Sequence, residues 1–200
     1  MQLKDYQLKV LDRFDCYLRM LREEREEAEA FMEFQRQRGK TVEPANYCIE
    51  TWKEMNRQAL LPLFRDSGGN LVQADYIDRR DGLNRPIPNV CFKVPTAGGK
   101  TILAAAALDR LNADYFRHQT GFVLWVTPSD SIYTQTWKAL ASREHPYRQI
   151  LERASGGRVR LLEKLDNFTL QDTQEYLCVM LLMLQSSARQ SKESLKMFQD

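Results

Sequence analysis

The chain has 200 residues, of which 43% are hydrophobic and 28% charged, and its 29 basic and 27 acidic residues leave a net charge of +2. This length supports one sizeable core, and the composition is ordinary for a globular protein. The near balance of charge neither requires nor excludes a nucleic-acid partner, because a basic patch can lie within a balanced total. No run reaches the ~18 apolar residues of a membrane span, and the first residues lack the apolar core of a signal peptide. We therefore expect no membrane partner.

The four cysteines, Cys16, Cys48, Cys91 and Cys178, lie too far apart in the sequence for a CxxC metal or redox motif. Cys91 and Cys178 sit inside apolar runs, which predicts that both are small core residues. With only two histidines in the chain, a zinc site is not expected. Free buried thiols fit a reducing compartment, and we expect a cytoplasmic protein.

The first part of the chain has helical character. Apolar residues recur at helical spacing from Leu3 to Leu21, and a charge-rich segment up to about residue 39 extends the helix with a solvated face. Residues 39–89 form a less regular insert with a short helix expected near residues 52–61. Its turn signals are "RDSGGN" and "RRDGLNRPIPN".

After residue 89 the pattern changes to alternating strands and helices. We predict strands at 90–94, 122–127 and 158–162 and helices at 101–111 and 130–140. The apolar run 176–184 fits either a buried strand or a core helix. This alternation predicts an α/β fold, with a parallel sheet flanked by helices and preceded by a helical insert.

The stretch "VPTAGGKT", residues 94–101, joins an expected strand to an expected helix through two glycines and Lys-Thr. Glycines let backbone N–H groups surround phosphate oxygens, and the helix points its positive end at the same anion. In such a loop Lys100 reaches the β- and γ-phosphates, and the Thr101 hydroxyl ligates Mg²⁺. The general pattern GxxxxGK[ST] places a glycine where Val94 stands, and an ordinary Gly-Gly turn is the alternative.

This loop resembles motif I of superfamily-two helicases, which reads Pro-Thr-Gly-x-Gly-Lys-Thr. It is most similar to the version in the Res subunit of type III restriction enzymes. The resemblance implies a RecA-like P-loop NTPase domain that binds ATP and Mg²⁺, with Lys100 and Thr101 in catalytic roles. The implied nucleotide contacts are Pro95, Thr96, Ala97, Gly98, Gly99, Lys100 and Thr101.

The stretch "LKDYQ", residues 3–7, resembles the Tyr-Gln element with which that family recognises adenine. The resemblance implies that Tyr6 and Gln7 lie near the phosphate loop and that the Gln7 amide reads the edge of the base. This role would explain a polar residue in phase with an apolar helical stripe. The alternative is a polar residue at a helix end.

Two further stretches resemble DNA-contacting segments of the same family. "VLWVTPSDSIYTQTWKAL", residues 123–140, is similar to the motif Ia region, which implies phosphate contacts by Pro128, Ser129 and Ser131. "LLMLQSSAR", residues 181–189, is similar to a later segment and implies contacts by Gln185 and Ser186. A plain strand-to-helix turn with a cap is the alternative for the first.

The resemblance implies the motor part of an ATP-dependent DNA translocase, divided into residues 1–21, an insert at 22–89 and an incomplete first RecA-like domain at 90–200. No Asp-Glu pair, as motif II requires, occurs in the sequence, so we expect a fragment that lacks motif II, the second motor domain and the nuclease. The implied partners are double-stranded DNA and a modification methyltransferase subunit that reads the DNA sequence. Alternatives are another P-loop enzyme, such as a kinase, and a non-catalytic nucleotide- or DNA-binding module.

Overall fold

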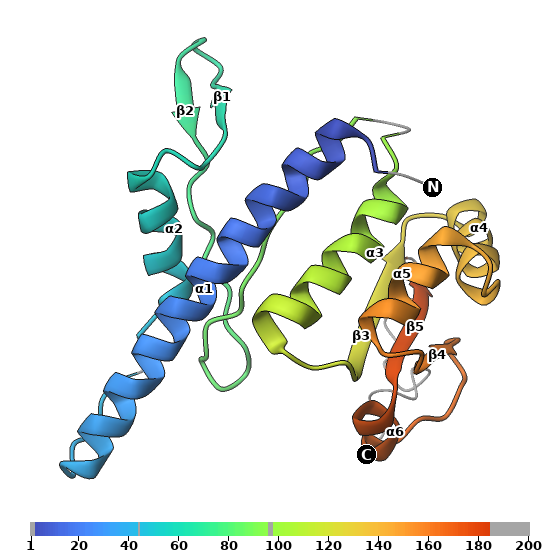
Figure 1. Cartoon of the computed structure of the whole chain (residues 1–200). Coiled ribbons are helices and arrows are strands. Elements are labelled where there is room, and N and C mark those ends of the chain that lie inside the picture. The colour runs from blue at the N-terminus through green and yellow to red at the C-terminus, as the bar shows by residue number, and fades with distance from the viewer. Residues whose placement is uncertain (1–2, 44, 96–97, 185–200) are drawn as a thin grey trace. The chain divides into compact units, whose positions relative to one another are not determined.

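The computed structural model describes residues 3–43, 45–95 and 98–184, and the chain forms two compact units (Figure 1). Lys4–Val94 form the first, which we call the helical unit, and the second begins at Pro95 and is called the sheet unit. In the described ranges, every helix is too short or too polar to cross a membrane.

The helical unit is built on one long helix, α1 (Asp5–Gln37), against which α2 (Tyr47–Arg57) packs. The buried side chains of α1 recur every three or four residues, as a helix with one buried face requires: Leu11, Phe14, Leu18 and Leu21. Beyond them the helix is mostly exposed and carries the ion pairs Arg22–Glu26 and Arg25–Glu29. The expected N-terminal helix is confirmed, and it runs without interruption through residue 21.

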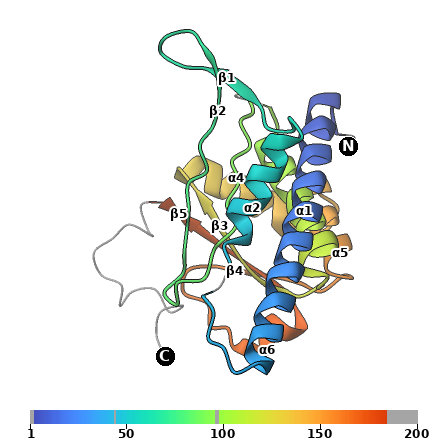
Figure 2. The same ribbon diagram turned by 90° about the vertical axis from the view of Figure 1, so that its left-hand side faces the viewer.

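A short antiparallel hairpin follows α2 and consists of β1 (Leu63–Arg65) and β2 (Leu71–Gln73). Figure 2 shows it extending beyond the ends of the two helices. The Asp66 carboxylate shapes the turn, because its Oδ1 accepts the backbone N–H groups of Gly68 at 2.9 Å and Asn70 at 2.8 Å. Hydrogen bonds from Asn70 hold the pKa of Asp66 below its usual value. The turn predicted at "RDSGGN" is therefore confirmed.

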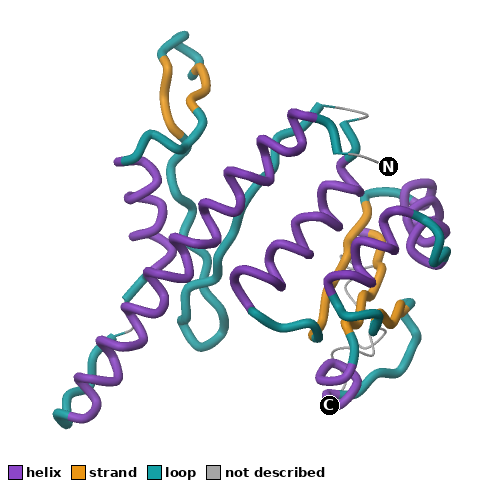
Figure 3. The backbone as a smooth tube through the Cα atoms, viewed as in Figure 1, coloured by secondary structure: helices purple, strands orange, loops and turns teal. Residues whose placement is uncertain are grey.

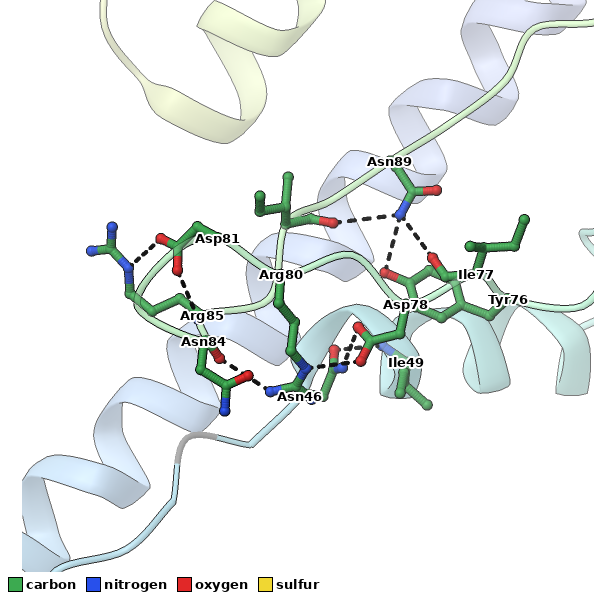
Figure 4. A network of polar contacts seen from close by, with 11 residues as sticks. Asn46, Ile49, Tyr76, Ile77, Asp78, Arg80, Asp81, Asn84, Arg85 and Asn89 are labelled. Atoms are coloured by element: carbon green, nitrogen blue, oxygen red, sulfur yellow. Dashed lines mark hydrogen bonds and ion pairs between the residues drawn. The ribbon is translucent and has the colours of Figure 1, made fainter.

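Residues 74–89 have no regular structure but are held by polar contacts (Figure 4). The Asp78 carboxylate accepts hydrogen bonds from Asn46 Nδ2 and from Arg80 Nε, both at 2.8 Å, and these donors keep its pKa low. Asn46 also caps α2 by accepting the N–H of Ile49. Asn89 Nδ2 donates to the carbonyl of Ile77 at 3.1 Å. These contacts tie the loop to the start of α2.

The strand predicted at residues 90–94 is absent, since this segment pairs with no strand in the described parts of the chain. Val90 is 46% exposed and Cys91 is also exposed, so the predicted core position of Cys91 is wrong too. Instead only one side of the segment packs against the protein. The ring of Phe92 meets Phe14 of α1 edge-on, with centroids 5.1 Å apart, while Lys93 faces solvent. An apolar run that contains a lysine can bury its apolar side chains against the surface of one helix, so it does not have to form a strand in a sheet.

The sheet unit contains three parallel strands in the order β3-β5-β4, which are β3 (Gly121–Thr127), β5 (Leu177–Met183) and β4 (Val159–Leu162) (Figure 3). The ambiguous run 176–184 is therefore a strand. It lies at the centre of the sheet, and the residues from Leu177 to Leu182 are all buried. A parallel strand covered on both faces is expected to be continuously apolar.

Helices flank this sheet, as predicted. They are α3 (Lys100–Arg110), α4 (Asp130–Ala141), α5 (Pro146–Ala154) and the short α6 (Leu170–Glu175), and a π-helical segment η1 (Leu111–Phe116) extends α3. On one face Ala105, Leu140 and Leu151 of the first three helices pack against alternate residues of β5. On the other face Phe168 packs near Cys178 and Met180. The coarse prediction of an α/β fold with a parallel sheet between helices is confirmed.

A buried arginine joins three parts of this unit. Arg148 of α5 is only 7% exposed, and its Nε donates to Glu152 Oε1 at 2.6 Å. Its two terminal nitrogens donate to the carbonyls of Leu140, at the end of α4, and Val159, at the start of β4. Because one side chain donates to all of these acceptors, Arg148 links α5 to the end of α4 and to the start of β4.

Candidate nucleotide-binding loop and the adjoining sheet edge

The loop before α3 has the tight geometry that its glycines suggest. The N–H of Gly98 donates to the carbonyl of Pro95 at 3.0 Å. A Cβ on Gly98 would lie 2.8 Å from that same carbonyl oxygen, so a larger residue cannot occupy the position without moving the backbone. Gly99 is left-handed at φ 70° and is the N-terminal cap residue of α3. Thr96 and Ala97, which were predicted to contact the nucleotide, lie outside the described residues.

Lys100 is the first residue of α3 and is exposed. Its Nζ donates to the carbonyl oxygen of Pro95 at 3.2 Å, so the ammonium group lies over the mouth of the loop. The amide groups of the first helical turn have no partner within the helix, and they share this end with Lys100. The start of α3 thus brings the Lys100 ammonium group and the free backbone donors of the first helical turn together, and such an arrangement suits an anion such as a phosphate.

Thr101 is half-buried and lines a cavity of about 270 Å³ together with residues of α4 and the start of α5. Lys138 and His145 also line it, and neither belongs to a motif predicted from the sequence. His145 caps α5 by accepting the Tyr147 N–H on Nδ1 at 3.2 Å. No local motif marks these two residues, since only the packing of α4 and α5 brings them beside Thr101.

The described residues contain no group of three or more His, Cys, Asp or Glu side chains that could hold a metal ion. Mg²⁺ is often held by only one or two protein groups together with phosphate oxygens and water. The hydroxyl of Thr101, at the head of α3, fits the part of a single protein ligand to a phosphate-bound Mg²⁺. The loop and Thr101 together are therefore compatible with a magnesium nucleotide.

The carboxyl end of β3 lies at the same edge of the sheet as the start of α3 (Figure 1). Ser129 is the extended N-terminal cap residue of α4, and its side chain makes no capping hydrogen bond. Pro128, Ser129 and Ser131 are all exposed. Thr127 pairs with Met183 at the end of β5, so residue 184 leaves the sheet at this edge too. Gln185 and Ser186 lie outside the described residues.

The charges near the start of α4 oppose an anionic ligand. Asp130 is the first residue of the helix and is exposed. Burial raises the pKa of the Tyr133 phenol, and the carboxylates of Glu163, Asp166 and Asp130 raise it further. A nucleic-acid phosphate at this edge would therefore depend on backbone and hydroxyl donors more than on charge.

Tyr6 and Gln7 lie in the first turns of α1, in the helical unit. Gln7 is only 4% exposed, and its Oε1 accepts the backbone N–H of Lys4 at 2.9 Å. This contact supplies the helix-end role that the sequence left open, because it satisfies an N–H group at the helix start. The predicted closeness of Gln7 to Lys100 stays a prediction.

Comparison of the chain with protein-family models, with curated proteins and with solved structures found no match.

Proposed function

We propose that this chain is the ATP-binding part of an ATP-dependent DNA translocase similar to the Res subunit of type III restriction enzymes. ATP with Mg²⁺ is the proposed ligand, double-stranded DNA the proposed track, and a modification methyltransferase subunit the proposed partner. On this proposal the sheet unit is an incomplete RecA-like domain, and the chain alone binds ATP without hydrolysing it.

The observation that carries the proposal is the loop between Pro95 and Thr101. Gly98 approaches the Pro95 carbonyl too closely for any Cβ, Gly99 is left-handed, and Lys100 opens a helix with its ammonium group over the loop. An ordinary glycine turn needs the backbone conformation, but it does not need a lysine held across its mouth. The same helix packs on a parallel sheet, and ligands of such sheets bind at the carboxyl edge.

Each residue has a defined part in this proposal. The backbone N–H groups at the start of α3 hold the phosphates, Lys100 leaves the Pro95 carbonyl and contacts the terminal phosphates, and Thr101 offers its hydroxyl to the bound magnesium ion. Phosphoryl transfer also needs a group that positions the attacking water and, commonly, an arginine from a second domain. The sequence has no Asp-Glu pair to supply the first.

Two measurements test the proposal on the full chain. Isothermal titration calorimetry with ATP and Mg²⁺ should show one site per chain, and a phosphate-release assay should show no steady turnover. GTP serves as the control for adenine recognition and should bind more weakly. Absence of any ATP binding would overturn the proposal. Steady phosphate release would instead point to another complete P-loop enzyme.

A further inference from the structure

The second half of α1 carries an exposed pair of aromatic side chains. Phe31 is 51% exposed and Phe34 is 53% exposed, whereas the buried side chains of α1 lie no further along the helix than Leu21. Figures 1 and 2 show this part of α1 extending beyond α2 within the helical unit. Residues three apart on a helix are neighbours on its surface, so the two rings form one apolar patch outside the core.

Charged residues flank this patch on the same face of the helix. Steps of three or four residues separate the members of this row, and all of their side chains are exposed: Glu23, Glu27, Phe31, Phe34 and Arg38. Such spacing keeps side chains in line along one face of a helix. We call this row the distal stripe. Its order along the helix is acidic, then aromatic, then basic.

The charges of the distal stripe lack the partners that their neighbours have. In the described parts of the chain, Glu23 and Glu27 have no ion-pair partner. Arg38 has no carboxylate partner there either, and its guanidinium carbon lies 5.4 Å from the centroid of the Phe34 ring. Other charged residues of this part of α1 form ion pairs along the helix: Arg22–Glu26, Arg25–Glu29 and Arg36–Glu33. The stripe thus has unmatched negative charge at one end and unmatched positive charge at the other.

Repulsion among carboxylates marks the acidic end. Burial raises the pKa of Glu24, which lies next to the stripe, and the carboxylate of Glu27 raises it further, as do glutamates of α2 and Glu23. A positive charge brought to this end would relieve the repulsion.

The distal stripe is complementary to a second copy of itself in the antiparallel direction. Glu27 lies four residues before Phe31, and Arg38 lies four residues after Phe34, so the two charges are equally far from the middle of the aromatic pair. When two stripes face each other in opposite directions, Phe31 of each meets Phe34 of the other, and Glu27 of each meets Arg38 of the other. A twofold axis relates the two copies, as in most protein dimers. In a parallel pair, like charges would face each other.

We propose that the distal stripe is an interface between two copies of this chain, in which the helices pair antiparallel with the phenylalanine rings at the centre and a Glu27–Arg38 ion pair on either side. The stretch from Glu27 to Arg38 is only about 16 Å long, so the contact is smaller than a standard protein–protein interface. The dimer is therefore weak and forms at high protein concentration. This interface lies wholly in the helical unit and does not depend on the function proposed above.

Sedimentation equilibrium of the full chain at low salt, over about 5–500 µM protein, tests the proposal. We expect a monomer–dimer equilibrium with a dissociation constant of about 10–500 µM, as for a small interface. High salt should weaken the dimer, because exposed ion pairs are screened. A chain that remains monomeric at the top of this concentration range would overturn the proposal.

Charge reversal identifies the pairing. Glu27→Arg and Arg38→Glu each place like charges opposite each other and should weaken the dimer about fivefold or more. The double variant Glu27→Arg/Arg38→Glu restores both ion pairs and should recover the parent affinity, and so should an equal mixture of the two single variants. Glu26→Arg, outside the stripe on the same helix, is the control and should change the affinity less than about twofold. A dimer that the single reversals do not weaken, or that the double variant does not recover, is held by another surface, and the proposal fails.

Removal of the rings tests the centre of the interface. Phe31→Ala and Phe34→Ala should each lower the affinity about tenfold, as for central residues of an interface. Circular dichroism should show an unchanged helix content, since neither ring belongs to the core. Phe64→Ala removes an exposed phenylalanine of β1 and is the matched control. Equal losses in all three variants would show that the stripe does not hold the dimer.

Discussion

The ammonium group of Lys100 lies 3.2 Å from the carbonyl oxygen of Pro95, five residues earlier in the chain. A neutral carbonyl is a modest acceptor for a cation, whereas a phosphate forms a charge-assisted hydrogen bond that is about twice as strong. The lysine is therefore held near the loop by a contact that a phosphate can replace at little cost.

Lys100→Ala should weaken ATP binding by about 10- to 150-fold, which corresponds to about 1.5–3 kcal/mol for a hydrogen bond to a charged group. Calorimetry with ATP and Mg²⁺ measures it. Lys40→Ala removes an exposed lysine in the helical unit and should leave the affinity unchanged. If both variants bind ATP as the parent chain does, Lys100 has no role in nucleotide binding.

Gly98→Ala should also impair ATP binding, for a different reason. The added Cβ would lie 2.8 Å from the Pro95 carbonyl oxygen, so the loop backbone must move. We expect at least a tenfold loss of affinity in the same titration. Gly82→Ala is the matched control, because no heavy atom outside its immediate neighbours lies within 4 Å of its Cβ position. A Gly98→Ala chain with full affinity would show that the loop does not hold the phosphates.

Gln7→Glu separates the two roles of this residue. The carboxylate still accepts the Lys4 N–H, so the helix start is preserved, but the amide donor that would read adenine is lost. We expect a lower ratio of ATP to GTP affinity with a nearly unchanged melting temperature. An unaltered ratio would assign Gln7 to the helix end alone.

Ser129→Glu should weaken DNA binding at least threefold, because it adds a negative charge where Asp130 already opposes a phosphate. Fluorescence anisotropy with a labelled duplex over a salt series is the measurement. Few phosphate contacts predict a shallow log–log salt slope of about −1 to −3. Ser142→Glu, at the other end of α4, is the control for charge. Equal losses in the two variants would mean that DNA is not held at the start of α4.

Arg148→Met should lower the free energy of unfolding by about 3 kcal/mol, since it leaves Glu152 and two carbonyls without their donor. Urea denaturation followed by circular dichroism measures the change. Arg143→Met removes an exposed arginine and should cost less than about 0.5 kcal/mol. If Arg148→Met lowers the free energy of unfolding as little as Arg143→Met does, water replaces the hydrogen-bond donors of Arg148 at no cost.

The contrast between two apolar runs shows how far the sequence predicts this fold. The run 122–127 was predicted as a strand and is one, because it is bounded by turn residues and continues into a capped helix. The run 90–94 has similar composition, but it lies along α1 with Phe92 against Phe14. Strand pairing depends on partners far away in the sequence, and local composition cannot supply them.

The candidate sites divide in the same way. Gly98, Gly99 and Lys100 were predicted from a contiguous motif, whose backbone requirements are local. Lys138 and His145 reach the cavity beside Thr101 only through helix packing. A motif of neighbouring residues can therefore be found in the sequence, whereas a site that depends on the packing of distant elements cannot, and the roles of Gly98, Gly99 and Lys100 in nucleotide binding stay predictions.

The central place of β5 in the sheet sets the order in which the protein can fold. β3 and β4 do not pair with each other, and each pairs only with β5, the last of the three to be synthesised. Thr127 donates to the Leu182 carbonyl across 55 residues of sequence. The helices α1 and α2 both precede residue 58, so their contacts can form while the ribosome is still making the rest. The sheet must wait for β5 to emerge, and until then β3 has no strand partner on either edge among the described residues.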